Sequence, residues 1–124
     1  MKSPIHNQMS TVFIHVTDLV RSVKWYCQLL DQEFNEEQIS LPVYNLNIEG
    51  VTGLTLDAGP EDELKEIHPS MYPLFNLHTN DIQESYLFVK KLNYSIQSDI
   101  VYFDDFSCFN IADPDSHVIM ICTG

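Results

Sequence analysis

The residues of this chain that could do chemistry are two histidines, one aspartate and three cysteines. His15 and His78 fall at equivalent places in a repeated pattern, and Asp57 lies on a strand expected to run parallel beside the one that carries His15. Two histidines and one carboxylate form a known iron-binding set, and either histidine could act as an acid–base group near neutral pH. The simpler interpretation is that all three are polar rim residues, hydrogen-bonded near helix N-termini or in contact with a ligand without a metal.

The three cysteines, Cys27, Cys108 and Cys122, include no CxxC pair. An odd number of cysteines without metal-type spacing indicates free, mostly buried thiols in a reducing cytoplasm. A nucleophilic cysteine needs a base within hydrogen-bond reach, and the sequence shows no pairing of cysteine with histidine. We therefore interpret Cys122, beside Met120 on the last strand, as a buried and inert thiol.

A strand followed by a helix occurs twice in the chain and must position these groups. In the first copy, Val12, Ile14 and Val16 alternate with other residues at the period of a strand, and Asp18 is a favoured helix N-cap. Aligning Asp18 with Asp81 also aligns His15 with His78. The repeat predicts two stacked modules.

Each module is predicted to contain one strand, one helix and three further strands, which gives an α+β fold of two βαβββ modules forming a curved mixed-sheet cup. We expect one domain over 1–124, with module one at about 10–58, a linker at about 59–70 and module two at about 71–124. The remaining strands of module one are predicted at 34–39, 41–49 and 51–57, and the linker holds a short acidic helical turn over 61–67. Module two has a strand at 74–79, a helix at 81–92 with a capping box, a hairpin of 94–102 with 106–111, a type I turn at 113–116 and a strand at 118–122.

Composition narrows the classes of partner. The chain has 124 residues, 44% of them hydrophobic, and a formal net charge of −12, which suits one compact domain with a real core. The acidic balance argues against binding a nucleic-acid backbone and would attract cationic small molecules, although a solvated charged surface is the simpler interpretation. No segment has the length of a signal peptide core or of a membrane span, so we expect a cytoplasmic protein without a membrane partner.

The strand face opposite to the helices is expected to line the cup, where it mixes small, polar and apolar side chains as a ligand pocket does. An anionic ligand is disfavoured because Asp57 shares this face and no lysine or arginine does. The residues that we expect to contact a ligand are Phe13, His15, Thr55, Asp57, Asn76, His78 and Met120.

Two phrases carry a resemblance to a known family. HVTDLVRSVKWYCQLL over 15–30 and FNIADPDSHVIMI over 109–121, together with the paired modules, resemble the vicinal oxygen chelate superfamily. That superfamily includes glyoxalase I, extradiol dioxygenases, fosfomycin resistance enzymes and bleomycin resistance proteins. The resemblance covers nearly the whole chain and implies the fold and a homodimer, whose cups are often completed by one module from each chain. It says little about activity, because the fold hosts many chemistries.

The resemblance also locates the metal-ligand positions of the members that bind a metal, which here hold Thr11, Gly53, Leu74 and Met120. These residues cannot hold a divalent ion, because glycine and leucine have no donor and the thioether prefers soft ions. The chain thus resembles the metal-free branch typified by bleomycin resistance proteins, which sequester a cationic drug in a cleft between two chains. Two smaller departures are Asp31 and Ser116, which stand where the family often has glycine.

These features predict a protein that sequesters a neutral or cationic organic ligand in the cup without turnover, and with no metal and no other cofactor. The alternative is a metal-dependent lyase or dioxygenase of the same superfamily. Its relocated site would use the residues that lie four positions beyond three of the family ligand positions, namely His15, Asp57 and His78.

Overall fold

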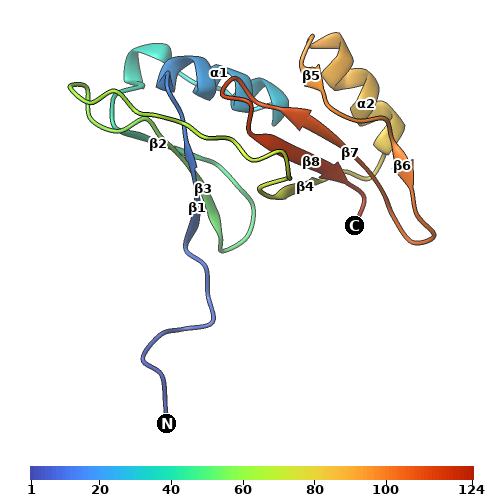
Figure 1. The fold of residues 1–124 in the computed structure, drawn as a ribbon, viewed down its shortest axis with the longest axis horizontal. Coiled ribbons are helices and arrows are strands. Elements are labelled where there is room, and N and C mark those ends of the chain that lie inside the picture. The colour runs from blue at the N-terminus through green and yellow to red at the C-terminus, as the bar shows by residue number, and fades with distance from the viewer. The chain divides into compact units, whose positions relative to one another are not determined.

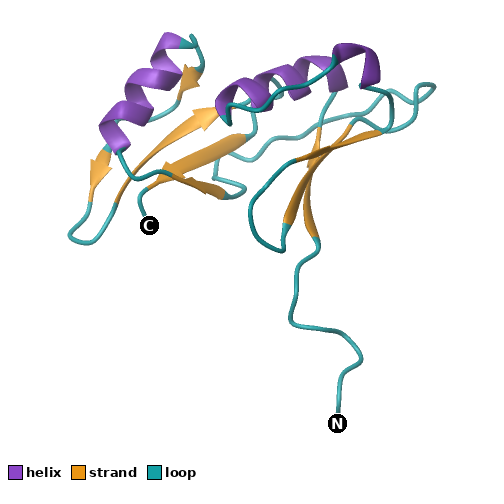
Figure 2. Ribbon diagram, turned by 180° about the vertical axis from the view of Figure 1, so that it is seen from behind, coloured by secondary structure: helices purple, strands orange, loops and turns teal.

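The computed structural model describes residues 1–124, which divide into two compact units, Met1–Ile67 and His68–Gly124. Each unit combines one α-helix with a mixed sheet (Figures 1 and 2). The structure confirms the predicted α+β class with two βαβββ-like modules. No helix has the length and the apolar character needed to cross a membrane.

The first unit contains a three-stranded sheet with one α-helix packed on it. Its elements are β1 (Thr11–His15), α1 (Leu19–Leu29), the 3-10 helix η1 (Glu36–Gln38), β2 (Val43–Leu46) and β3 (Gly53–Asp57). The strand order is β1-β3-β2, with β1 parallel and β2 antiparallel to β3. The helix contacts β2 and β3, and the side chains of Ile14, Val23, Tyr26 and Leu56 are fully buried.

The second unit repeats this plan with more strands. Its elements are β4 (Asn76–His78), α2 (Ile82–Lys91), β5 (Ser95–Ile96), β6 (Val101–Tyr102), β7 (Ser107–Ala112) and β8 (Val118–Cys122). The sheet order is β4-β8-β7-β5, and β6 also pairs with β7. Only the β4–β8 pair is parallel. The helix contacts β5, β7 and β8, and the rings of Tyr86 and Phe109 meet edge to face at 5.2 Å.

Both predicted helix caps are confirmed, and they have nearly the same geometry. Asp18 has φ −136° and ψ 105°, Asp81 has φ −140° and ψ 102°, and each carboxylate accepts from the backbone N–H three residues ahead, at 3.1 and 3.0 Å. The capping box expected from Glu84 is only half formed, because the Asp81 N–H donates instead to the Thr79 hydroxyl at 3.2 Å. The sequence repeat therefore corresponds to a repeated cap structure, which at Asp81 also includes the Thr79 hydrogen bond.

One local prediction in the first unit is wrong and another holds only in part. The segment 34–39 was expected to be a strand but forms η1, because Asn35 accepts from the Glu37 N–H at 3.1 Å and caps a tight turn of exposed acidic residues. The expected helical turn over 61–67 is a single turn, closed by Glu63 N–H to Pro60 O at 3.2 Å. Because η1 replaces a predicted strand, the first unit has three strands where the βαβββ plan has four. In the second unit, the predicted strand 94–102 is interrupted between β5 and β6, where the Ser98 hydroxyl accepts from the Asn110 N–H at 2.9 Å.

Three residues other than glycine adopt left-handed backbone conformations. Asp31 (φ 53°) and Asn93 (φ 61°) follow the C-caps of α1 and α2, and Ser116 (φ 69°) lies in the turn between β7 and β8. That turn is the predicted one, closed by Ser116 N–H to Asp113 O at 2.9 Å. Left-handed backbone geometry favours glycine. This is a physical reason why the family that the sequence resembles often has glycine at the two positions that hold Asp31 and Ser116 here.

Candidate functional site

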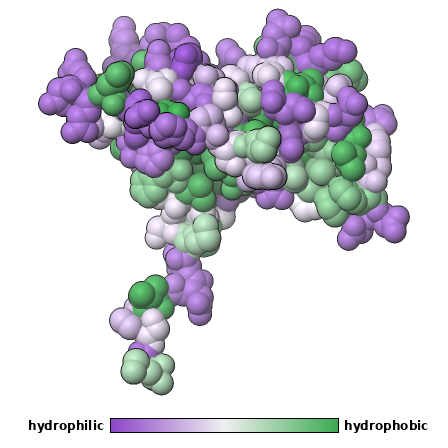
Figure 3. All heavy atoms as spheres, viewed as in Figure 1, coloured by the Kyte–Doolittle hydropathy of each residue, from purple (hydrophilic) through white to green (hydrophobic).

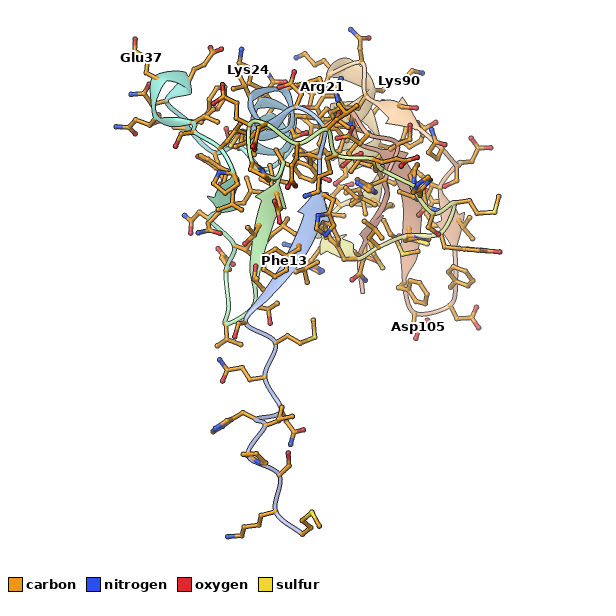
Figure 4. All side chains as sticks on the ribbon, turned by 60° about the vertical axis from the view of Figure 1, so that its left-hand side comes forward. Phe13, Arg21, Lys24, Glu37, Lys90 and Asp105 are labelled. Carbon is orange, nitrogen blue, oxygen red and sulfur yellow. The ribbon has the colours of Figure 1, made fainter.

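The helix-free face of the first sheet carries Phe13 and Thr55 side by side. Phe13 on β1 pairs in register with Thr55 on β3, which pairs with Asn45 on β2. Phe13 is 55% exposed whereas Ile14 and Leu56 are fully buried toward the helix, as the strand alternation predicts. Figure 4 shows Phe13 on β1, away from the labelled charged residues of α1. Ligand contact at Phe13 and Thr55 stays a prediction.

A chain of polar side chains crosses this face at its centre. The Thr55 hydroxyl donates to Asn45 Oδ1 at 2.8 Å, so it accepts from the Thr11 hydroxyl, whose oxygen lies 2.8 Å away. Asn45 was not predicted to take part, although its position in the alternation of β2 could have revealed it. These hydrogen bonds use only one lone pair of the Asn45 amide oxygen. The other lone pair and the amide NH₂ group can bond to a ligand.

Asp57, at the end of β3, is held in an ion pair that the sequence did not reveal. Lys65 Nζ lies 3.2 Å from Asp57 Oδ1 and donates to the Asp57 backbone oxygen at 2.7 Å, and the Gly59 N–H donates to the same carboxylate at 2.9 Å. Burial alone would raise the pKa of Asp57, but the Gly59 hydrogen bond and the Lys65 ammonium, with a smaller contribution from His15, lower the pKa below its ordinary value. The strand pattern showed no lysine or arginine on this face, but Lys65 of the linker, which that pattern could not place, forms an ion pair with Asp57 and offsets its charge.

A cavity of about 370 Å³ adjoins this ion pair within the first unit. Its lining includes Pro42, Val43, Asp57, Leu64 and Lys65. The volume lies in the range of small-molecule sites. The cavity places apolar side chains next to the ion pair, at the same end of the sheet as His15, the register partner of Asp57.

The helix-free face of the second sheet has two rows of partners across β4, β8 and β7. One row is Asn76, Met120 and Asn110, and the next is His78, Cys122 and Cys108. Asn76 and His78 are exposed and Met120 is half-buried. Ile119 and Ile121, on the opposite side of β8, are buried. Met120 is thus an apolar side chain between the amides of Asn76 and Asn110. Asn110 was not among the predicted ligand contacts.

The structure divides the predicted His–His–Asp set between the two units. His15 and Asp57 are register partners in the first unit, whereas His78 belongs to the second, where its Nε2 lies 2.9 Å from Asn80 Oδ1. Neither unit gathers three His, Cys, Asp or Glu side chains into a group that could hold a metal ion. His78 is thus partnered by Asn80, and Asp57 by Lys65.

Comparison with known proteins identifies the fold. No protein-family model and no curated protein matches the sequence. Solved structures do match, among them a glyoxalase/bleomycin resistance protein/dioxygenase from Alicyclobacillus acidocaldarius, with TM-score 0.65 and 19% identity over 98% of this chain and 93% of that one. The chain has the glyoxalase/bleomycin resistance/dioxygenase fold. A glyoxalase/dioxygenase from Nostoc punctiforme (TM-score 0.70, 15% identity, 98% and 97% covered) and the oxidase ChaP-H1 (0.69, 16%, 96% and 97%) are similar to it over the same extent.

The residues that the sequence resemblance places at metal-ligand positions do not fit a divalent ion. Thr11 and Gly53 are register partners, the Thr11 hydroxyl is engaged with Thr55, and a Cβ built on Gly53 would lie 3.2 Å from Thr11 Oγ1. In the second unit the corresponding side chains are those of Leu74, which is 45% exposed, and Met120. A hydroxyl, a thioether and two residues without donors do not make a site for a hard or borderline cation.

Proposed function

We propose that this protein binds a small organic molecule, neutral or cationic, on the helix-free faces of its sheets and does so without a metal or other cofactor. The observation that carries the proposal is the composition of these faces. Phe13 is more than half exposed beside a polar Thr–Asn chain, and Met120 lies between two asparagines. Apolar surface with a few fixed hydrogen-bonding groups is the character of a small-molecule site.

The net charge of the protein, more than any single residue, predicts the charge of the ligand. Asp57 is neutralised locally by Lys65, so it no longer argues against an anion by itself. The net charge of −12 still does, because it lowers the local concentration of anions and raises that of cations. A sequestering role like that of the bleomycin resistance proteins is consistent with this charge and with the residues at the metal-ligand positions.

The test compares two charge-introducing substitutions of equal chemistry. Native mass spectrometry of freshly purified protein would identify a co-purified ligand, and bleomycin would serve as a cationic probe in calorimetric titration. Met120→Lys places a positive charge in the apolar centre of the second face, which repels a cationic probe and disrupts contact with a neutral one, and should weaken binding at least about tenfold, or about 1.4 kcal/mol. Met71→Lys, at a residue that is 79% exposed and off the strands, adds the same charge elsewhere and should leave binding unchanged. Equal binding by both variants would contradict the proposal.

One observation favours a second function, a metal-dependent lyase or dioxygenase with a relocated site at His15, His78 and Asp57. Two of the similar structures are described as an oxidase and a glyoxalase/dioxygenase. The Lys65 ion pair opposes it, because the Asp57 carboxylate would have to exchange that partner for the metal. Elemental analysis separates the two functions. Near one equivalent of iron, zinc, nickel or manganese per chain, lost in His15→Ala and His78→Ala, would support the relocated metal site and contradict the metal-free proposal.

A further inference from the structure

Cys108 and Cys122 lie directly opposite each other on the adjacent antiparallel strands β7 and β8. The neighbouring pair, Ser107 and Thr123, is hydrogen-bonded through Thr123 N–H to Ser107 O at 3.0 Å. Hydrogen-bonded and non-hydrogen-bonded pairs alternate along an antiparallel ladder, so the two cysteines form a non-hydrogen-bonded pair, with a Cα separation of about 4.5 Å. That spacing falls within the range of about 4.4 to 6.8 Å found in disulfides.

Both thiols are nearly enclosed and reduced. Cys108 is 7% and Cys122 3% exposed. Burial raises the pKa of the Cys108 thiol, and the nearby Cys122 raises that pKa further. The Gly124 N–H donates to Cys122 Sγ at 3.3 Å, so this sulfur is turned along the strand toward the end of the chain. Rotation about the Cα–Cβ bond of Cys122 would turn its sulfur toward the sulfur of Cys108.

The third member of this row does not make the pair a metal site. His78 is the register partner of Cys122 on β4, but its ring is hydrogen-bonded to Asn80, and no group of three ligating side chains is formed. The remaining cysteine, Cys27, is fully buried on α1 in the other unit. It provides an internal control for the reactivity of a single buried thiol.

We propose that Cys108 and Cys122 are a cross-strand dithiol that peroxide oxidises to an intramolecular disulfide. One thiolate attacks an oxygen of hydrogen peroxide, which breaks the O–O bond, forms a sulfenic acid and releases hydroxide. The other thiol then attacks the sulfenic sulfur, which forms the S–S bond and expels water, while its proton and one from solvent complete two molecules of water. The two cysteines lose two electrons in total and peroxide gains them. The reaction is faster at higher pH because the first step needs a thiolate.

The experiment treats the full chain with hydrogen peroxide, blocks the remaining thiols, and digests the unfolded protein with a protease that cuts before aspartate. Cleavage before Asp113 and Asp115 separates the peptide with Cys108 from the peptide with Cys122. We expect the two peptides to stay joined until a reductant is added, one blocked thiol per chain at Cys27, and a non-reduced protein with the mass of a single chain. The Cys27→Ala variant should form the same linked peptide.

Cys108→Ser and Cys122→Ser should each abolish the linked peptide. In each variant the remaining cysteine of the pair should stop at the sulfenic acid, which a sulfenic-acid reagent added with the peroxide should label. The wild-type result does not depend on whether these variants fold. Three free thiols after peroxide treatment would overturn the proposal, as would a linkage that involves Cys27 or that joins two chains.

Discussion

The two helices place a serine at the same point, but only one of these serines finds a hydrogen-bond partner. Ser22 and Ser85 each stand four residues after the N-cap, and their backbone N–H groups donate to the cap carbonyls at 3.0 and 3.1 Å. Ser85 Oγ bonds to Thr79 Oγ1 at 2.6 Å and to the Asp81 carbonyl at 2.8 Å. Ser22 is fully buried, and its hydroxyl has no hydrogen-bond partner. The threonine partner has no counterpart in the first unit, where Val16 stands at the place of Thr79 in the repeat.

This difference predicts opposite effects for the same substitution. A buried hydroxyl without a partner costs about 1 to 3 kcal/mol, and a hydrogen bond contributes about 0.5 to 1.5 kcal/mol. Alanine also has a higher helix propensity than serine by a few tenths of a kcal/mol. We therefore expect Ser22→Ala to raise the free energy of unfolding by about 1 kcal/mol, and Ser85→Ala to lower it by a similar amount.

Urea denaturation followed by circular dichroism would measure both changes, with an unaltered dependence on denaturant as evidence that the unfolding reaction is the same. A double-mutant cycle tests the cause, because Val16→Thr would supply the missing partner and should cost less in the wild type than in the Ser22→Ala variant. If Ser22→Ala lowered stability as much as Ser85→Ala does, the Ser22 hydroxyl would have to be satisfied and this reasoning would be refuted.

Three further predictions concern the turn, the ion pair and the assembly. Ser116→Gly should raise the free energy of unfolding by about 1 kcal/mol, measured by urea denaturation, because Ser116 has φ 69°; a loss of stability would contradict this. The pKa of Asp57 is lowered in the folded state, so its contribution to stability is complete above its ordinary value of 3.8 and is lost as the pH falls through the lower folded-state value. Lys65→Met should raise the Asp57 pKa in carboxyl NMR titrations and reduce stability at pH 7 more than in strong acid, whereas Lys24→Met, which breaks an exposed pair with Glu36, should do neither. Finally, we propose a homodimer, and light scattering that gives a monomer mass at every concentration would exclude it.

Local physical chemistry accounts for what the sequence could predict. Asp18 and Asp81 cap their helices because a short carboxylate side chain reaches backbone N–H groups of its own first turn. The faces of β1 and β8 follow from alternation along a single strand, so the exposed Phe13 and the buried Ile14 could be assigned before any fold was known. The turn at Asp113 likewise depends on a few adjacent residues.

The sequence by itself also predicts that Thr11, Gly53, Leu74 and Met120 do not form a divalent metal site, because donor chemistry belongs to the residue type. Only the tertiary structure decided which groups meet. The Lys65 ion pair with Asp57, the alignment of Cys108 with Cys122 and the isolated hydroxyl of Ser22 each depend on a contact between separate segments. Strand register and side-chain direction determine such contacts, and neither can be predicted from the residues of one segment alone.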